Sequence, residues 1–267
     1  MPMYSPPGAP LPSVTWANRG SAAQIGARRR CSDVGPNPGM VIVANGTLWR
    51  PEQITPIWTG SALTGYINFG GSSATYTQTG TTVTVSQTSH GMTADFNGDY
   101  VYLTQSTGAL VTGWFLNFIY IDANTFSCTS TVSQSTSGNL GTSTGEVVIP
   151  WSYALPTGLP QACDSVALQY LHSAKNSANN KTAKHYLGGL AIYSGSGVVL
   201  TTGGLVQQVS AGSQVLVSTS TFVTPAISSG PQALGNSTYT ISSTLANASD
   251  WHRIVPQSVT FSARYDP

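Results

Sequence analysis

Apolar and polar residues alternate along the chain from about residue 56 onward, which is typical of strands that bury one face. Residues 81–86 alternate in this way, and residues 99–103 are rich in aromatic and β-branched side chains. Residues 118–121 lead through a polar turn at 122–124 into a further run at 125–131. Clusters of Gly, Asn, Asp and Ser separate these runs at intervals of about ten residues, which predicts an all-β sandwich or barrel.

Two longer strands are predicted near the C-terminus, because every second side chain of a strand points to the same face. The first strand places Tyr239, Ile241, Ser243 and Leu245 on one face, and the second does the same with Val259, Phe261, Ala263 and Tyr265. Polar residues at 246–253 predict a loop between them, and residues 173–184, polar throughout, predict another loop. We expect the two strands to contribute to a β-sandwich core.

The N-terminal part of the chain has a different character. Residues 1–24 contain five Pro and show no periodicity, which predicts an extended, polyproline-like arm. Short strands are predicted at 27–34 and 40–44, and an Asn45-Gly46 turn of the hairpin type then leads into a returning segment at 47–49. Residues 25–55 therefore predict a small β module.

The composition excludes two classes of protein. Only 7% of the residues are charged, and Ser (34) and Thr (33) together make up about one residue in four. A coiled coil would be rich in Ala, Glu, Lys, Leu and Arg, and a disordered solvating chain would combine high net charge with few aromatic residues. No segment approaches the ~20 apolar residues that a membrane-spanning helix needs, so we expect no membrane insertion.

Charge is unevenly distributed although the net charge is only +1. Residues 1–50 carry five Arg and one Asp, residues 51–164 carry six acidic residues and no Lys or Arg, and residues 165–267 carry five basic and two acidic residues. These changes lie close to the changes in composition. They divide the chain into four predicted units at 1–24, 25–55, 56–145 and 146–267.

Three groups of short motifs resemble parts of the virion appendage proteins of tailed bacteriophages, the tail-fibre, head-fibre and related minor structural proteins. GAR at 26–28, DVG at 33–35 and NGTLWRP at 45–51 resemble a short N-terminal β module. SHGM at 89–92, GDYVYL at 98–103, STGAL at 106–110, DANTF at 122–126 and SGN at 137–139 resemble a small β-barrel module, with GWF at 113–115 where GTY is usual. Asn176, NNK at 179–181, LGG at 187–189 and LANASD at 245–250 resemble a C-terminal jelly-roll-like domain.

This resemblance implies a fold for each unit and a role for the whole chain. It implies an N-terminal β anchor module at 25–55, a small β-barrel-like module at 56–145 and a jelly-roll-like sandwich at 146–267. The chain would be a non-enzymatic component of the virion's outer surface, in first place a tail fibre that docks through its N-terminal region and projects oligomeric β domains. Its partners would be a tail adaptor, a portal-proximal or capsid protein, and further copies of itself in a homotrimer or homodimer.

Two alternatives stay open at this point. A head fibre or capsid decoration (cement) protein would have the same kind of architecture and would differ in where it attaches. A carbohydrate-binding receptor module, with a host surface glycan as its ligand, belongs to a different functional class.

Few residues suggest catalysis. Glycoside cleavage needs two carboxylates across the scissile bond, and Asp95 with Asp99 is the only close acidic pair. Asp and Asn bond to their own backbone in turns, so residues 95–99 predict a turn. The run also has the style of a Ca²⁺ loop but lacks that loop's ligand set and terminal Glu.

Other motifs are equally unspecific, and we predict no catalytic, cofactor-binding or metal-binding residue. The four histidines lie far apart in the sequence, at His90, His172, His185 and His252. Gly195-Ser196-Gly197 lacks the strand–turn–helix setting of a nucleophile elbow and predicts a tight turn. No glycine-rich phosphate-binding loop occurs. The three cysteines, Cys31, Cys128 and Cys163, are too far apart for a tight metal site and are interpreted as small buried apolar residues.

The basic triplet Arg28, Arg29 and Arg30 is the one candidate docking site. On a strand, Arg28 and Arg30 share a face and Arg29 points to the other. The triplet is either a solvated strand or a contact to an acidic neighbour, since arginine binds carboxylates in a bidentate manner. Nucleic acid is not an expected partner, because the chain offers no broad basic face.

Aromatic residues suggest one further candidate. Trp114, Phe115, Phe118 and Tyr120 would offer a stacking platform for sugar rings, although aromatic side chains in small sandwiches mostly belong to the core.

Overall fold

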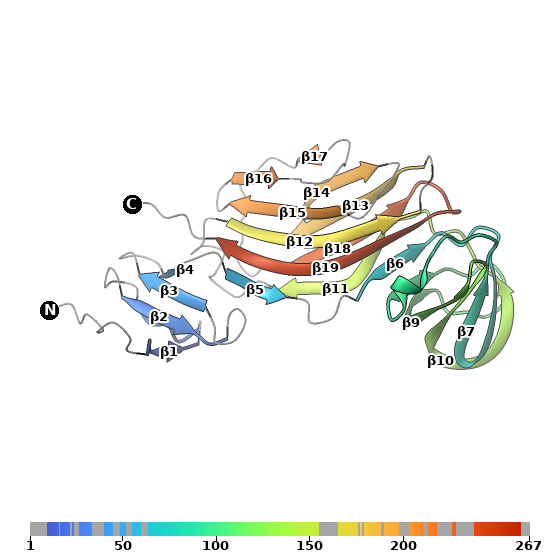
Figure 1. Ribbon diagram of the computed structural model, residues 1–267, viewed down its shortest axis with the longest axis horizontal. Coiled ribbons are helices and arrows are strands. Elements are labelled where there is room, and N and C mark those ends of the chain that lie inside the picture. The colour runs from blue at the N-terminus through green and yellow to red at the C-terminus, as the bar shows by residue number, and fades with distance from the viewer. Residues whose placement is uncertain are drawn as a thin grey trace.

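The structure is a computed structural model, and it consists almost entirely of strands (Figure 1). It describes residues 10–15, 17–21, 23, 27–33, 40–44, 49–51, 55–59, 64–154, 165–175, 177, 179–187, 190–197, 203–210, 213–217, 226–227 and 238–262. Among these residues the only helical element is the 3₁₀ turn η1 (Ala94–Phe96). The predicted all-β sandwich class is therefore confirmed.

The N-terminal unit is a four-stranded sheet with the order β1-β2-β3-β4. Its strands are β1 (Ser13–Val14), β2 (Arg28–Cys31), β3 (Met40–Ala44) and β4 (Trp49–Pro51). The strand predicted at 40–44 has these bounds, and the predicted turn at 45–46 lies outside the described residues. Because β1 pairs in parallel with β2, part of the segment predicted as an extended arm belongs to this sheet.

Two further sheets form the sandwich in the middle of Figure 1. The first contains β16 (Ser213–Val217), β15 (Gly203–Ser210), β12 (Ser165–Ala174) and β19 (Trp251–Ser262), with β5 (Thr55–Thr59) and β6 (Tyr66–Phe69) both paired to β19. The second has the order β11 (Val147–Ala154), β18 (Thr238–Leu245), β13 (Lys181–Leu187), β14 (Leu190–Gly197) and β17 (Ala226–Ile227).

The chain path through the sandwich is nested. Four antiparallel pairs join its eight main strands from the outside inwards: β5 with β19, β11 with β18, β12 with β15, and β13 with β14. The predicted inward face of β18 is confirmed, because Tyr239, Ile241, Ser243 and Leu245 are all buried. For the last strand, Val259 is buried; the structure does not describe the side chain at 261, and residues 263 and 265 lie outside the described ranges.

A second unit is inserted in the chain between β5 and β11. Its strands follow the order β6-β8-β9-β10-β7 and comprise, beside β6, β7 (Thr75–Ser86), β8 (Tyr100–Leu103), β9 (Gly113–Asp122) and β10 (Thr125–Asn139). An isolated bridge joins Gln105, just after β8, to Leu140, just after β10, but within the described residues the pairing does not close into a barrel. The predicted barrel-like module is thus an open, curled sheet.

Several predicted boundaries need correction. The pairing of β5 with β19 assigns residues 55–59 to the sandwich, whereas the sequence put the start of the barrel-like module at residue 56. The predicted loop at 173–184 is limited to residues 175–180, and the one at 246–253 to 246–250. Gly195-Ser196-Gly197 lies within β14 and forms no turn of its own. Polar residues occupy strand positions in these stretches because neighbouring strands and ion pairs provide their hydrogen-bond partners. A pattern of polar residues in the sequence does not reveal such partners.

The start of β19 joins the inserted unit to the sandwich. Trp251 belongs to the hydrophobic core of the inserted unit, where its ring meets the edge of Phe96 at a centroid distance of 5.1 Å. Two residues further, Arg253 donates hydrogen bonds to both carboxylate oxygens of Asp99, at 2.5 and 3.3 Å. The backbone N–H of Gly65 also donates to Asp99 at 2.6 Å, so the buried carboxylate is fully engaged.

Replacing Asp99 should therefore destabilise the protein. Asp99→Ala leaves the Arg253 guanidinium without its partner beside the core, and we expect a loss of roughly 3 kcal/mol in the free energy of unfolding. Asp95→Ala removes a carboxylate from an exposed position of the same loop and should change the free energy by no more than about 0.5 kcal/mol. Urea unfolding followed by tryptophan fluorescence measures both, and equal small effects would contradict the role given to Asp99.

Candidate functional site

The predicted docking triplet lies on β2, with β1 on one side and β3 on the other. Arg28 is exposed, whereas Arg29 and Arg30 are half-buried. The guanidinium carbon of Arg29 lies 5.4 Å from the centre of the Trp49 ring, a cation–π contact within the sheet. Strand alternation leaves Arg28 and Arg30 together on the other face.

Trp49 is held in place for this contact. Its indole N–H donates to the carbonyl of Gly20 at 2.9 Å, and the side chain is buried. Gly20 has a positive φ of 72°, and the guanidinium nitrogens of Arg29 lie 4.0 Å from the position a Cβ there would take. Arg29 therefore serves the internal packing of the N-terminal sheet. The docking site predicted from the triplet reduces to Arg28 and Arg30, and docking itself stays a prediction.

The acidic pair considered for catalysis is separated by the fold. Asp95 is exposed in η1, and Asp99 is buried beside Arg253. Burial raises the pKa of Asp99, and the hydrogen bond and charge of Arg253 oppose that shift. One carboxylate in solvent and one consumed by an arginine do not form a facing pair. The predicted turn at 95–99 is present as the end of η1 and its following turn.

Two of the four histidines have described side chains, and both are internal. His90 accepts a hydrogen bond at Nδ1 from the N–H of Met92 and contacts the carbonyl of Asp122 through Nε2. Burial lowers the pKa of His90, so the neutral ring is favoured. His252 lies with Nδ1 3.0 Å from Ser243 Oγ. The histidines at 172 and 185 lie on β12 and β13, and the structure does not describe their side chains.

The cysteines behave as small buried residues where the structure describes them. Cys31 and Cys128 are both buried and free. Burial raises the pKa of the Cys31 thiol to about 11, and it raises the pKa of Cys128 further. The third cysteine, at 163, lies outside the described residues. Within the described ranges no three His, Cys, Asp or Glu side chains gather at a metal-binding distance.

The structure does not assemble the aromatic platform proposed from the sequence. Phe115 and Phe118 are buried in the core of the inserted unit, and Tyr120 packs against that core. Trp114 points to the opposite face, where its indole N–H donates to the carbonyl of Val148 on β11 at 3.1 Å.

A different aromatic group surrounds Trp114. Its ring meets the edges of Tyr66 and Tyr102 at 5.9 and 5.4 Å, and Tyr66 stacks on Tyr100 at 5.2 Å. All four side chains are half-buried. They come from the adjacent strands β6, β8 and β9, so their spacing in the sequence did not predict that they meet.

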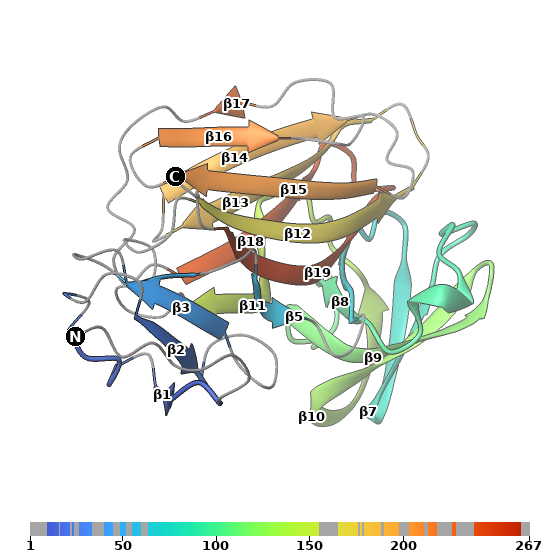
Figure 2. The same ribbon diagram turned by 60° about the vertical axis from the view of Figure 1, so that its left-hand side comes forward.

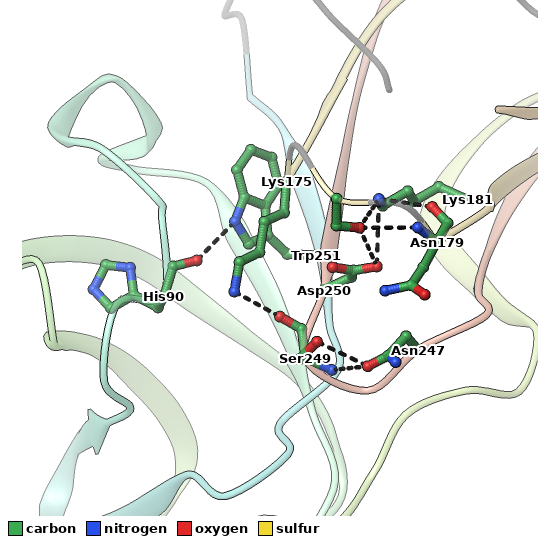
Figure 3. A network of polar contacts seen from close by, with 9 residues as sticks. His90, Lys175, Asn179, Lys181, Asn247, Ser249, Asp250 and Trp251 are labelled. Atoms are coloured by element: carbon green, nitrogen blue, oxygen red, sulfur yellow. Dashed lines mark hydrogen bonds and ion pairs between the residues drawn. The ribbon is translucent and has the colours of Figure 1, made fainter. Parts of the chain in front are cut away.

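The most strongly buried charges of the described chain lie in a loop cluster that the sequence analysis missed (Figure 3). Lys181 Nζ and Asp250 Oδ2 are 3.3 Å apart, and both side chains are almost completely buried. The Ser177 hydroxyl accepts a hydrogen bond from Lys181 at 2.6 Å and donates one to Asp250 at 2.9 Å. Lys181 also donates to the carbonyl of Asn179 at 2.8 Å.

The same network continues toward the inserted unit. Lys175 Nζ donates to the carbonyl of Ser249 at 2.9 Å, and Asn247 accepts hydrogen bonds from both the N–H and the hydroxyl of Ser249. On the other side of Asp250, the indole N–H of Trp251 donates to the carbonyl of His90 at 2.9 Å (Figure 3). The cluster therefore fixes the two loops that precede β13 and β19.

A second polar cluster occupies the outer side of the other sheet. Glu146 pairs with Lys184 at 2.7 Å and accepts hydrogen bonds from the hydroxyls of Tyr186 and Ser242. Burial would raise the pKa of Glu146, but the hydrogen bonds from Lys184, Ser242 and Tyr186 lower it to about 2. All of these groups take part in holding three neighbouring strands, β11, β13 and β18.

Both clusters escaped prediction for the same reason. Residues 173–184 were predicted to form a polar loop. Lys181 and Lys184 were therefore not placed on a strand, and no face of a sheet was assigned to them. Within that stretch Ala183 is buried between Thr182 and Lys184, which are half-buried, and this alternation was the available pattern for β13.

Comparison with known proteins assigns no family. No protein-family model and no curated protein matches the chain. Among solved structures, the VP2 subviral particle of infectious bursal disease virus aligns with 91% of this chain and 66% of its own, at 9% identity and a TM-score of 0.20. The structure of the Gx strain of that virus aligns with 85% of this chain and 70% of its own, at 10% identity and a TM-score of 0.15. T=1 particles derived from the virus align with 93% of this chain and 76% of their own, at 12% identity and a TM-score of 0.13. The chain thus spans just under two thirds of the first of these proteins, and likenesses this weak establish no common fold.

The described residues also contain no helix that is long and apolar enough to cross a membrane.

The Glu146 cluster predicts a loss of stability in acid. The pKa of Glu146 is about 2 in the folded protein, below its ordinary value of 4.5, so its contribution is complete above about pH 4.5 and disappears as the pH falls toward 2. Because the pair is partly exposed, we expect a contribution of about 1 kcal/mol or less. Glu146→Gln should flatten the fall of the unfolding free energy between pH 5 and 2.

Urea unfolding at a series of pH values measures this slope, with Asp95→Asn as the control for removing an exposed carboxylate. An unchanged slope in Glu146→Gln would show that Glu146 is not engaged as described.

Proposed function

We propose that the chain is a non-enzymatic structural component of a tailed bacteriophage particle, and our preferred assignment is a tail fibre. It docks through its N-terminal sheet and projects the sandwich with its inserted unit. The observation that carries this proposal is the arrangement along the long axis of the molecule. In Figure 1 the N-terminal sheet lies at one end, the inserted unit at the other and the sandwich between them, and in Figure 2 the two smaller units lie on opposite sides below the sandwich.

The path of the chain through the sandwich supports a jelly roll. In that fold a long antiparallel double strand is rolled up, so the first strand pairs with the eighth and the second with the seventh. The four nested pairs β5·β19, β11·β18, β12·β15 and β13·β14 follow this scheme. Jelly rolls serve in viral capsid and lectin domains, although a fold by itself does not define a function.

The engagement of the charged groups supports a role without catalysis. Asp99, Asp250 and Glu146 each pair with a basic side chain that ties strands or loops together. These three carboxylates, of which the sequence had singled out only Asp99, are thus engaged in architecture. A packed structural role fits this use better than a reaction centre.

One uncharged surface supports contacts between copies of the chain. Thr82 and Thr84 of β7 lie beside Thr129 and Ser127 of β10, and the next strand, β9, exposes Leu116, Ile119 and Ile121. Exposed aliphatic residues bordered by small polar ones are typical of protein–protein interfaces, whose centres are poor in charge. We therefore assign this face of the inserted unit, the β9 face, to packing between protomers.

A head fibre or capsid decoration protein would use the same features and attach to the capsid. A glycan-binding module is favoured by one observation, the half-exposed group of Tyr66, Tyr100, Tyr102 and Trp114, because aromatic rings stack on sugar faces. The experiments below separate these alternatives.

The docking role of the N-terminal sheet is testable on assembled particles. Arg28→Glu combined with Arg30→Glu should lower incorporation of the chain about tenfold or more, because charge reversal turns attraction to an acidic neighbour into repulsion. Asp95→Lys, a charge reversal at an exposed site of the inserted unit, is the control and should incorporate normally. Quantitative mass spectrometry of purified virions gives the amounts, and labelling of the chain shows whether it lies on the tail or the head.

Normal incorporation of the double arginine variant would contradict docking through β2. A chain that is absent from virions but protected against heating by a host glycan would favour the carbohydrate-binding module.

Protomer packing on the β9 face predicts a second result. Ile119→Glu places a charge at its centre and should weaken self-association about tenfold or more, since charged residues are excluded from interface cores. Val111→Glu makes the same change at another exposed aliphatic residue, in the loop before β9, and should leave association unchanged. Sedimentation velocity over a range of protein concentrations measures both, and identical profiles for the two variants would remove this face from the interface.

A further inference from the structure

The buried cluster around Lys181 contains the two functional groups of an amide bond in contact with each other. Lys181 Nζ lies 3.3 Å from Asp250 Oδ2, and the relative exposures of the two side chains are 0% and 1% (Figure 3). A lysine amine is a nucleophile once it has lost its proton. A carboxyl group becomes an electrophile that this amine can attack once the carboxylate has gained a proton.

Ser177 connects the two groups by a path for that proton. Its hydroxyl oxygen accepts a hydrogen bond from Lys181 Nζ at 2.6 Å, while its hydroxyl hydrogen points to Asp250 Oδ2 at 2.9 Å. If the serine oxygen takes a proton from the ammonium group and passes its own to the carboxylate, the lysine becomes a free amine and the aspartate a carboxylic acid. Both charges of the buried pair disappear in this transfer.

The surroundings favour the reacted form over the ion pair. In the described part of the chain, Asp250 Oδ1 is buried and has no hydrogen-bond partner. An unsatisfied oxygen of a buried carboxylate costs more free energy than one of a neutral group. An amide at this position would leave the same oxygen as a neutral carbonyl.

We propose that Lys181 and Asp250 condense into an intramolecular isopeptide bond. After the proton transfer through Ser177, the Lys181 Nζ electron pair attacks Cγ of Asp250, and a bond forms between Nζ and Cγ. The bond between Cγ and Oδ2 breaks, and Oδ2 leaves with two protons as one water molecule. No oxidant, reductant or cofactor is needed, and atoms and charge balance.

The positions of the two reacting groups favour a fast condensation. The Asn179 carbonyl at 2.8 Å and the Ser177 hydroxyl hold Nζ from two sides, so the amine and the carboxyl group are already in place. Fixing two reactants in contact replaces an encounter in solution by an intramolecular step. Ser177 acts as a positioning and proton-transferring residue, and Lys181 and Asp250 are the reactants.

The product would cross-link the two sheets of the sandwich. Lys181 opens β13 in one sheet, and Asp250 directly precedes β19 in the other. A covalent link between distant segments restricts the unfolded chain and thereby stabilises the fold, as disulfides do. This inference goes beyond the proposed function and does not depend on it, because the condensation of Lys181 with Asp250 requires no virion or binding partner.

Mass spectrometry of the folded, full-length chain tests the proposal. The intact mass should be lower than the sequence mass by one water molecule. Trypsin should no longer cut after Lys181, and the fragments 176–184 and 185–253 should appear as one joined species lighter than their sum by one water. Lys181→Arg should show the full intact mass, which separates the cross-link from cyclisation of Asp250 on its own backbone.

Two serine variants test the proton path without removing either reactant. Ser177→Ala should keep the fold, seen by circular dichroism, and react at least about tenfold more slowly, the effect of about 1.4 kcal/mol on a barrier. Ser177→Thr retains the hydroxyl and should restore the reaction. A wild-type chain of full mass that trypsin cuts after Lys181 would overturn the proposal, as would loss of water in Lys181→Arg. A Ser177→Ala chain that reacts at the wild-type rate would overturn the role of Ser177.

Discussion

The architecture depends on a single strand that faces two hydrophobic cores. At the start of β19, Trp251 enters the core of the inserted unit and Arg253 pairs with Asp99. The alternate residues His252 and Ile254 are buried on the opposite face, where His252 meets Ser243 of the second sheet. Because successive side chains of a strand point to opposite faces, one continuous strand can bind both units. The inserted unit is thereby fixed by the last strand of the sandwich.

Buried polar groups reinforce the same junction. Asp99 and Arg253 lie on one side of it, and Lys181 and Asp250 lie beside it where β13 and β19 begin. Losing one partner of a buried ion pair is strongly destabilising, because it leaves the other charge buried without compensation. In a chain with 7% charged residues, these few charges are concentrated where segments distant in sequence must meet in one geometry.

The sequence predicted the fold class because alternation is a local property. Strands β3 and β8 were found near their observed bounds, only the first half of β10 was predicted, at 125–131, and the inward face of β18 was identified residue by residue. Partners distant in sequence were not predictable in this way. Nothing in the alternation links Arg253 to Asp99, Trp114 to Tyr66, or Lys181 to Asp250, because each pair meets only through the pairing of nonconsecutive strands. The polar stretch at 173–184 misled the prediction for a related reason, since Lys181 and Lys184 are satisfied by ion pairs that hydropathy does not register.

We propose that the N-terminal sheet docks to the particle and that the sandwich with its inserted unit projects from it. A density map of the intact virion tests it most directly. The account predicts that residues 13–51 contact a neighbouring virion protein, with Arg28 and Arg30 at the contact, while the sandwich and inserted unit extend away from the particle and touch only other copies of the chain. A map in which the sandwich docks and the N-terminal sheet faces solvent would contradict it.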